Sequence, residues 1–323
     1  MNKLLYALGF ATALSFTSPT IGQERYPVQP VTIVVPFATG GGVDILTRRL
    51  ADSMSARLDQ QVVVQNLTGA GGNVGVTKVA RAPADGYTLV MATTGTHTIN
   101  PAVYASMPFD AIQDFSPITL VASVPNLFVV NAKLPADSLE EFIALAKANP
   151  GKYSFASFGN GTSNHLSGEL LKQLTDIDVL HVPYKSATQA VTDLIAGHVD
   201  FAFVNTPLSL PHVESGALKA FAVTTGERSE ATPQFPSMQE AGVPGFVVES
   251  WYGLMAPSGT PATIIRALHD ASTQSLAEPE VVAFFNQNGA DVITAPPALF
   301  SQMVINEQKR WAEVVEKSGA RID

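Results

Sequence analysis

The hydrophobic and polar positions of the chain alternate between two spacings, one typical of buried strands and the other of amphipathic helices. Residues 31–35 form a short β-branched apolar run, and the glycine-rich stretch 37–42 follows it directly. In the next segment, 44–58, large apolar side chains recur at every fourth position, which places them on one helix face. These positions are Leu46, Leu50, Met54 and Leu58. Strand, glycine loop and helix in this order predict half of a βαβ unit.

The same alternation continues along the chain and predicts two sets of α/β elements. The first set continues with strands at 62–65 and 87–92, a helix at 76–82 and a connecting loop at 100–115. The second set comprises helices at 139–148, 163–174 and 188–196 and strands at 153–157, 179–182 and 199–204. The tail from residue 262 has the pattern of helices, the last of them at 300–315.

Two segments are interpreted as crossings between lobes. Residues 118–131 hold two strand-like runs with only a short break between them, and another strand-like run at 218–225 follows the second set. The pattern therefore predicts two discontinuous α/β lobes. Lobe 1 is expected to consist of residues 23–123 and 226–323, and lobe 2 of residues 124–225.

The first residues have the three-part layout of a secretory signal peptide. Lys3 precedes an apolar run at 4–16, and a small and polar stretch follows at 15–22. The apolar run is too short to span a membrane, and no capping signal supports the alternative of an N-terminal core helix. We expect residues 1–22 to be removed by cleavage near Gly22, within a few residues, and the mature protein to be exported to the periplasm.

Composition and charge exclude several classes of protein. With 46% hydrophobic and 15% charged residues, the chain has the composition of a folded protein rather than a disordered one. Its formal charge of −9 argues against nucleic acid as a partner, because nucleic-acid binding needs a concentrated basic surface. The absence of cysteine excludes disulfides, thiolate metal sites, a cysteine nucleophile and a lipid-anchored cysteine.

Four loops combine glycine with hydroxyl or amide side chains directly after an expected strand. They are 36–44, 68–75, 93–97 and 157–165, and Asn205 with Thr206 makes a fifth such place. In open α/β sheets ligands gather at the carboxyl ends of strands, where helix N-termini offer free N–H groups to an anion. None of the loops contains Lys or Arg, so they predict an anion held by amides, hydroxyls and water. The alternative for each loop is ordinary turn chemistry.

Signals for catalysis, metals and cofactors are absent. Gly40, Gly41 and Gly42 fit neither the dinucleotide fingerprint nor the P-loop, whose lysine is missing. The six histidines show no metal-ligand spacing. Ser157, His165 and Asp200 could be combined into a triad, but no G-x-S-x-G motif supports it. We expect no catalytic residues, no metal, no cofactor and no enzyme activity.

A series of motifs, in order over residues 26–323, indicates a family. They are VVPFATGGGVD (34–44), GAGGNVG (69–75), ADGYTL (84–89), NPAVY (100–104), GNGTSNH (159–165), HVPYK (181–185), LKAFAVT (218–224) and GLMAP (253–257). With these motifs the chain resembles the Bug-type extracytoplasmic solute receptors, the periplasmic component of tripartite tricarboxylate transporters.

The resemblance implies a type II-like periplasmic binding protein fold: two lobes with mixed or parallel sheets flanked by helices, and a ligand cleft between them. It also implies a small organic carboxylate as ligand and a cleft lined by thirteen residues. These are Phe37, Ala38, Gly41, Gly42, Gly72, Asn73, Thr94, Thr96, Ser157, Asn160, Gly161, Thr162 and Asn205.

Two positions bear on the class of carboxylate. Asn205 stands where many members of the family have Asp, and its neutral amide offers no charge to pair with a ligand ammonium. Phe158 stands where small residues are frequent and favours an apolar or aromatic ligand body. We therefore expect a dicarboxylate or an aromatic acid rather than an amino acid.

The expected mechanism is capture by population shift, in which the ligand stabilises a closed form by contacting both lobes. The closed form then presents a composite surface to a membrane permease. Three alternatives remain at this point: a sensor whose closed form docks on the ectodomain of a receptor kinase, a periplasmic enzyme on the same scaffold, and a purely structural protein. A monomer is the default, since no residue pattern indicates an oligomer.

Overall fold

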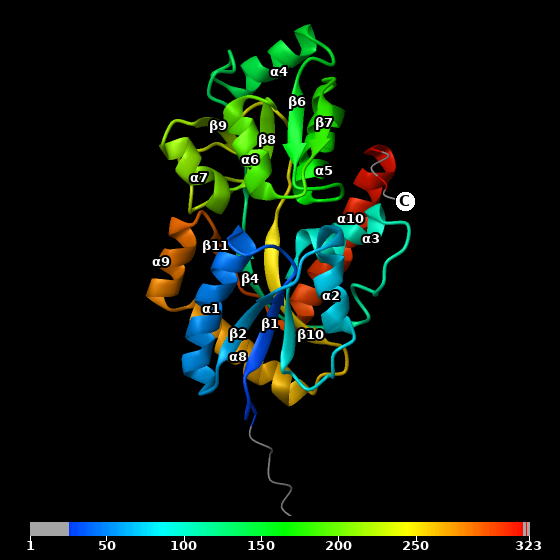
Figure 1. The fold of residues 1–323 in the computed structure, drawn as a ribbon, viewed down its shortest axis with the longest axis vertical. Coiled ribbons are helices and arrows are strands. Elements are labelled where there is room, and N and C mark those ends of the chain that lie inside the picture. The colour runs from blue at the N-terminus through cyan, green and yellow to red at the C-terminus, as the bar shows by residue number, and fades with distance from the viewer. Residues whose placement is uncertain (1–25, 319–320, 322–323) are drawn as a thin grey trace, which may run out of the picture.

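The computed structural model describes residues 26–318 and 321, so the signal peptide expected at 1–22 lies outside the described residues. The chain forms two α/β lobes, one above the other along the long axis of the molecule (Figure 1). We call the part built around the six-stranded sheet the first lobe and the part built around the five-stranded sheet the second lobe.

The sheet of the first lobe has the strand order β11-β4-β10-β3-β1-β2. Its strands are β1 (Val31–Val35), β2 (Val62–Asn66), β3 (Thr88–Thr93), β4 (Phe115–Ser123), β10 (Trp251–Pro257) and β11 (Asp291–Val292). β1 pairs in parallel with β2 and β3, whereas β10 runs antiparallel between β3 and β4. Its helices are α1 (Gly42–Leu58), α2 (Asn73–Ala80), α3 (Asn100–Val103), α8 (Ala262–Leu276) and α9 (Pro279–Gln287). The carboxyl ends of β1 and β3 thus lie at one edge of this sheet.

The sheet of the second lobe has the strand order β7-β6-β8-β5-β9. Its strands are β5 (Asn126–Asn131), β6 (Ser154–Ser157), β7 (Leu180–Pro183), β8 (Phe201–Asn205) and β9 (Leu218–Val223). β6 is parallel to both β7 and β8, and β5 is antiparallel to β8 and β9. The helices of this lobe are α4 (Leu139–Ala148), α5 (Ser163–Thr175), α6 (Ala187–Ala196) and α7 (Thr206–Glu214).

Local sequence explains the elements that were expected from periodicity. In α1, Leu46, Leu50 and Met54 are buried in the first-lobe core, as their four-residue spacing predicts. α4 begins behind Ser138, whose hydroxyl accepts a hydrogen bond from the backbone N–H of Glu141 at 3.1 Å. A serine in this position satisfies one of the free N–H groups of the first turn and contributes about 1 kcal/mol.

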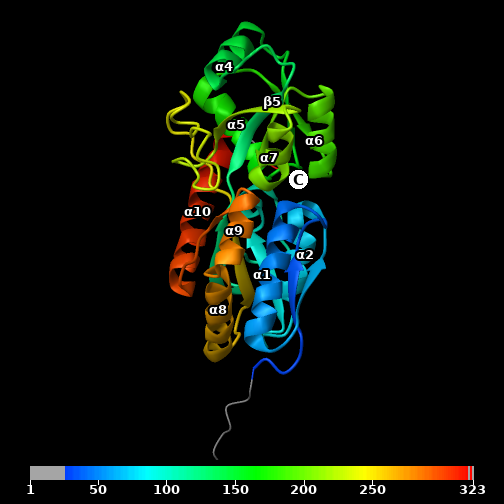
Figure 2. The ribbon, with the colours of Figure 1, turned by 90° about the vertical axis from the view of Figure 1, so that its left-hand side faces the viewer.

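The last helix, α10 (Pro297–Ser318), belongs to both lobes. Phe300 and Val304 are buried in the core of the first lobe, whereas Trp311 and Val315 are buried in the core of the second. Figure 2 shows α10 running along one side of the molecule past the level where the lobes meet. The helix therefore connects the two cores in addition to the strands that cross between them.

The predicted two-lobed α/β fold is confirmed. Two local expectations need correction. The helix expected at 76–82 begins earlier, at Asn73, because the preceding glycines supply the turn. The segment expected as a loop at 100–115 opens with α3, whose Pro101 suits the first turn of a helix.

The chain passes from the first sheet to the second between β4 and β5, as the interruption at 123–126 indicated. It returns between β9 and β10. In that return, Met238, Val243 and Phe246 pack into the core of the second lobe. The lobe boundaries at 123 and 226 stay predictions. None of the helices in the described residues combines the length and apolar character needed to cross a membrane.

Candidate functional site

The first glycine loop joins β1 to α1 and is braced from below by Asp44. The carboxylate of Asp44 accepts hydrogen bonds from the Gly40 N–H and the Asn66 amide, each at 2.9 Å, and pairs with Arg48 at 2.9 Å. Burial alone would raise the pKa of this carboxyl, but the hydrogen bonds from Arg48, Gly40 and Asn66 together hold it below its usual value. Asp44 is thus a structural brace that leaves the loop backbone free to face a ligand.

Three of the predicted loops meet at Gly72. A Cβ at Gly72 would lie 2.6 Å from Cγ2 of Thr96 and 3.4 Å from Cζ of Phe37, so only glycine fits between them. Its φ of 96° also requires glycine. The loops after β1, β2 and β3 are thereby brought to one place, as the parallel pairing of their strands predicts.

The polar side chains of these loops are largely directed inward. The side-chain Oδ1 of Asn73 accepts a hydrogen bond from the Asn100 amide at 2.7 Å, and the hydroxyl of Thr94 accepts one from the backbone N–H of Trp251 at 2.8 Å. Thr96 contacts His97 Nδ1 at 2.9 Å and is fully buried. Asn73, Thr94 and Thr96 therefore fix the loops, whereas Phe37, Ala38, Gly41 and Gly42 are at least partly exposed.

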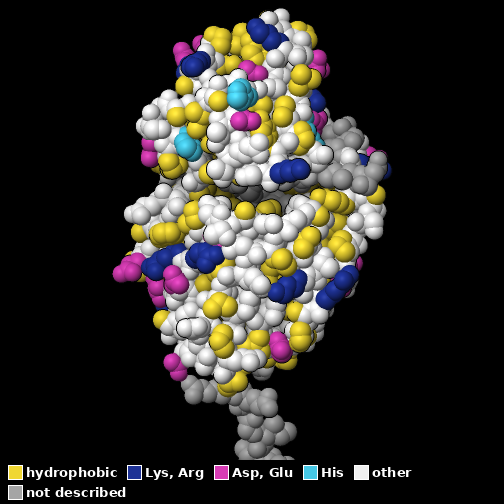
Figure 3. Space-filling view, viewed as in Figure 1, with side chains coloured by type: hydrophobic (Ala, Val, Ile, Leu, Met, Phe, Trp, Pro, Cys, Tyr) yellow, Lys and Arg dark blue, Asp and Glu magenta, His cyan; other side chains and the backbone are white. Residues whose placement is uncertain are grey.

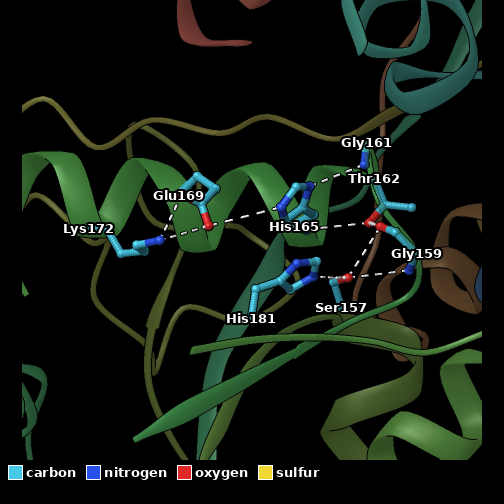
Figure 4. Close-up of polar contacts among 8 residues, drawn as sticks. All are labelled: Ser157, Gly159, Gly161, Thr162, His165, Glu169, Lys172 and His181. Atoms are coloured by element: carbon cyan, nitrogen blue, oxygen red, sulfur yellow. Dashed lines mark hydrogen bonds and ion pairs between the residues drawn. The ribbon is translucent and has the colours of Figure 1, made fainter. Parts of the chain in front are cut away.

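The loop of residues 157–162 in the second lobe is held by its own hydrogen bonds (Figure 4). The hydroxyl of Ser157 contacts His181 Nε2 at 2.6 Å and accepts from the Gly159 N–H at 3.3 Å. The hydroxyl of Thr162 donates to the Gly159 carbonyl at 2.8 Å. The same hydroxyl accepts from the backbone N–H of His165 and so caps the N-terminus of α5. Asn160, at the tip of the loop, is exposed to solvent.

Two histidines form a stack behind this loop. The rings of His165 and His181 are 4.0 Å apart and 19° from parallel, and the ring of Phe155 stacks on His181 at 4.8 Å. Burial lowers the pKa of His165, and burial together with the neighbouring His165 lowers the pKa of His181 to about 3. Both rings are therefore uncharged at neutral pH. The motif HVPYK contains His181, but the motif alone does not show that this residue contacts the 157–162 loop.

A row of amides fixes the orientation of Asn205. Asn164 donates to the Phe203 carbonyl at 2.6 Å and to Oδ1 of Asn126 at 3.2 Å. The amide nitrogen of Asn205 donates to the same Oδ1 at 2.8 Å. The backbone carbonyl of Phe203 can only accept, so the Asn164 atom that faces it is the amide nitrogen. That nitrogen faces Oδ1 of Asn126, and Asn205 therefore also directs its nitrogen to this Oδ1. Oδ1 of Asn205 is then left without a partner in the described part of the chain. Asn205 thus presents an acceptor.

The two lobes touch beside these loops, among other places at Gly42 and at Gly161. A Cβ at Gly42 would lie 3.4 Å from Cγ of Pro207 on α7 and 3.6 Å from the hydroxyl of Tyr252. A Cβ at Gly161 would lie 2.8 Å from Cγ1 of Val103 on α3. Pro207, Tyr252 and Val103 were not expected at the site. Their side chains carry no charge, and only the fold brings them near the glycine loops.

Figure 3 shows the surface between the lobes as a furrow across the molecule. A separate open cavity of about 460 Å³ lies beside the segments that cross between the lobes. It is lined by Thr225, Gly226, Glu227, Arg228, Ser229, Gln239, Glu249 and Asp291. None of the thirteen predicted ligand-binding residues lines this cavity, and its carboxylates disfavour an anion. We therefore place the candidate site at the furrow.

The possible triad does not assemble. Ser157 contacts His181 rather than His165, and Asp200 accepts hydrogen bonds from the backbone and hydroxyl of Ser154. Within the described residues, no group of three or more His, Asp or Glu side chains is placed to hold a metal ion. The chemistry that the loops offer is hydrogen bonding from neutral groups.

Comparison with known proteins gives a family. Residues 46–320 match the model of the tripartite tricarboxylate transporter family receptor. Protein BugT of Bordetella pertussis, strain Tohama I, is 36% identical over all of this chain and 99% of its own length. A solved protein of R. palustris with adipate is 35% identical with a TM-score of 0.88, covering 92% of this chain and 100% of that one. MatC of Rhodopseudomonas palustris, with bound malate, is 33% identical with a TM-score of 0.82, covering 90% and 100%.

Proposed function

The chain belongs to the tripartite tricarboxylate transporter family of receptors, and from this premise we propose that it captures a small organic carboxylate in the furrow between its lobes. The ligand is a dicarboxylate or an aromatic acid rather than an amino acid. The lobes close on it, and the closed monomer delivers it to the permease of a tripartite transporter. As a member of a receptor family the protein binds its ligand and does not transform it.

The observation that carries this proposal is the meeting of the glycine loops opposite the second lobe. Gly72 brings the loops after β1, β2 and β3 together, and Gly42 faces Pro207 across the furrow. Free N–H groups at the start of α1 and the exposed side-chain amide of Asn160 in the 157–162 loop can donate to carboxylate oxygens without an ion pair. Two relatives of the same fold carry adipate and malate, which supports a diacid as ligand.

The location that suits this function is the periplasm. The tripartite layout of residues 1–22 and the membership of a receptor family both support export before ligand capture. N-terminal sequencing of the protein purified from the periplasm tests the cleavage near Gly22. A protein that retains Met1 and stays with the cytoplasmic fraction would contradict it.

A thermal-shift screen tests the ligand class. The processed protein is unfolded and refolded to remove bound ligand, then heated with diacids, tricarboxylates, aromatic acids or acidic amino acids. Ligand at about 100 times its dissociation constant adds about 2.7 kcal/mol, which raises the melting temperature by several degrees. A shift with diacids or aromatic acids supports the proposal. A shift confined to aspartate or glutamate overturns the ligand class, and a flat panel overturns the carboxylate.

Delivery needs a separate test. The ligand-bound protein should be retained by the membrane subunits of a tripartite transporter, and the ligand-free protein should pass through. Retention by the ectodomain of a receptor kinase instead would favour the sensor function.

A further inference from the structure

The backbone of the 157–162 loop depends on one imidazole. The Gly161 N–H donates to Nδ1 of His165 at 3.2 Å (Figure 4). Because an N–H group donates this bond, Nδ1 carries no proton, and the proton of the neutral ring is on Nε2. Gly161 also lies against Val103 of the first lobe, so the position of its amide affects both the loop and the contact between the lobes.

The surroundings of His165 favour the neutral ring. One face of it stacks on His181 at 4.0 Å, and the aromatic ring of Phe155 lies beside both, 4.8 Å from the His181 ring and 6.5 Å from the His165 ring. Gly168 lets Phe155 lie directly on α5, because a Cβ there would come within 2.2 Å of that ring. The stack thus has no room for water between its rings, and a charge in it would be desolvated.

The charged groups acting on the pair within the described residues are Glu169 and Lys172, both on α5. Glu169 Oε1 is 4.0 Å from His165 Nε2, too far for a hydrogen bond. Its carboxylate is instead paired with Lys172 at 3.0 Å. β6 supplies Phe155 and Ser157 to the stack, and neither is charged. Glu169 therefore compensates a positive charge on His165 only in part, and burial and Lys172 both oppose that charge.

We propose that His165, backed by His181, is a positioning residue for ligand binding: its uncharged Nδ1 holds the Gly161 amide, and with it the 157–162 loop, in the conformation that receives the ligand. This inference rests on the proposed function. His165 itself lies behind the loop and acts through it. A proton on Nδ1 removes the acceptor and releases the loop, so the loop weakens in acid.

Two substitutions at one position separate these roles. H165N keeps an oxygen acceptor at the place of Nδ1 and cannot be protonated. H165L fills the same space with an apolar side chain and removes the acceptor. The matched control is H198N, since His198 is a histidine of the same lobe whose side chain is 71% exposed. Each variant is compared with the unsubstituted protein at about pH 7.5 and at about pH 4.0, the acid condition lying well below the usual histidine value because burial lowers the pKa of His165.

Hydrogen exchange of the 157–162 backbone amides, corrected for the intrinsic pH dependence, is measured without ligand. Adipate affinity is measured by calorimetry. H165L should exchange faster and bind adipate about tenfold more weakly at both pH values, as expected for the loss of an ordered loop hydrogen bond. The unsubstituted protein and H198N should change in this way only on acidification. In H165N loop exchange should change at neither pH, and the affinity for adipate should fall in acid only as far as protonation of adipate itself requires, a fall that all variants share.

Equal acid effects in H165N and the unsubstituted protein would overturn the inference, as would an unchanged loop in H165L. If H165L does not fold, the comparison of H165N with H198N across pH decides alone. If adipate fails to bind the unsubstituted protein, the proposed ligand class is in doubt, but exchange of the loop amides still decides the role of His165.

Discussion

Gly42 at the start of α1 lies against Pro207 at the start of α7, so the first helix of one lobe meets a helix of the other across the furrow. A Cβ at Gly42 would be 3.4 Å from Cγ of Pro207. The hydroxyl of Tyr252, on β10, is 3.6 Å from the same point. Gly42 and Tyr252 both belong to the first lobe, and Pro207 is the group that the second lobe brings against them.

A large side chain at Gly42 should therefore keep the lobes apart. We expect G42F to lose at least about tenfold in ligand affinity, because the closed form would have to overlap the ring of Pro207. G42A is the matched control, since a Cβ at 3.4 Å or more makes ordinary contact. Calorimetry gives the affinities, and small-angle scattering shows whether ligand still compacts the molecule. Equal affinity in G42F and G42A would contradict the closure that we propose.

The second contact between the lobes predicts a coupling between Gly161 and Val103. G161A meets two obstacles: a Cβ 2.8 Å from Cγ1 of Val103, and a φ of 77° that costs a side-chain residue about 1 kcal/mol. V103A removes the 2.8 Å contact with Cγ1, so that Cβ of residue 103 at 3.3 Å becomes the nearest atom, and it leaves the second obstacle. We expect V103A to recover part of the affinity that G161A loses, which a double-mutant cycle measures as a coupling energy. Strictly additive losses would show that the two residues are not in contact when ligand binds.

The sequence predicted the parts of the fold that depend on local patterns, and it did not predict contacts between segments far apart in the chain. The periodicity of α1 and the β-branched run of β1 are local patterns, and both elements formed where expected. The insertion of β10 between β3 and β4 joins segments far apart in the chain, and no local pattern indicates such a partner. α10 read as one amphipathic helix, but periodicity does not show that its two halves pack into different cores.

For the candidate site, the sequence indicated the loops better than the directions of their side chains. Glycine and polar residues after a strand mark the end of the sheet where a ligand can bind, and Gly72 indeed brings three loops together. The inward direction of Asn73 depends on Asn100, and that of Thr96 depends on its contact with His97 in the π-helical turn Gly95–Ile99. Such partners are set by tertiary packing, so motif spacing could not supply them.

The fixed amide of Asn205 predicts a preference within the diacids. Its free Oδ1 accepts hydrogen bonds, so it suits a ligand hydroxyl and repels a further carboxylate oxygen. We expect malate to bind more tightly than succinate, by the two- to tenfold that one hydrogen bond supplies. N205L should remove this difference and keep succinate binding. A malate preference that survives in N205L would place the ligand hydroxyl elsewhere.

The amide chain also allows a matched test of charge. In N205D a carboxylate replaces the amide, and the donor to Oδ1 of Asn126 is lost. We expect N205D to bind diacids more weakly and to gain affinity for aspartate, whose ammonium can pair with the new charge. Calorimetry with succinate and aspartate measures both changes. A weaker affinity of N205D for both succinate and aspartate would indicate that Asn205 only braces the loop.

Stability should fall in acid through His97, which is fully buried against Phe109 and Phe115. Burial lowers the pKa of His97 to about 3, whereas the unfolded chain keeps a value of about 6.5. Between these two pKa values His97 is protonated in the unfolded chain and neutral in the folded protein, so acid favours unfolding. The stabilisation from the neutral His97 is complete above about pH 6.5 and is lost as the pH falls, by up to about 1.4 kcal/mol per pH unit from this one group.

In H97L the slope of unfolding free energy against pH should be shallower by about that amount. Urea unfolding at several pH values measures it, and H198L, which changes an exposed histidine, is the control. His165 and His181 contribute in the same direction, so a slope remains in H97L; an unchanged slope would mean that His97 titrates normally and is reached by water.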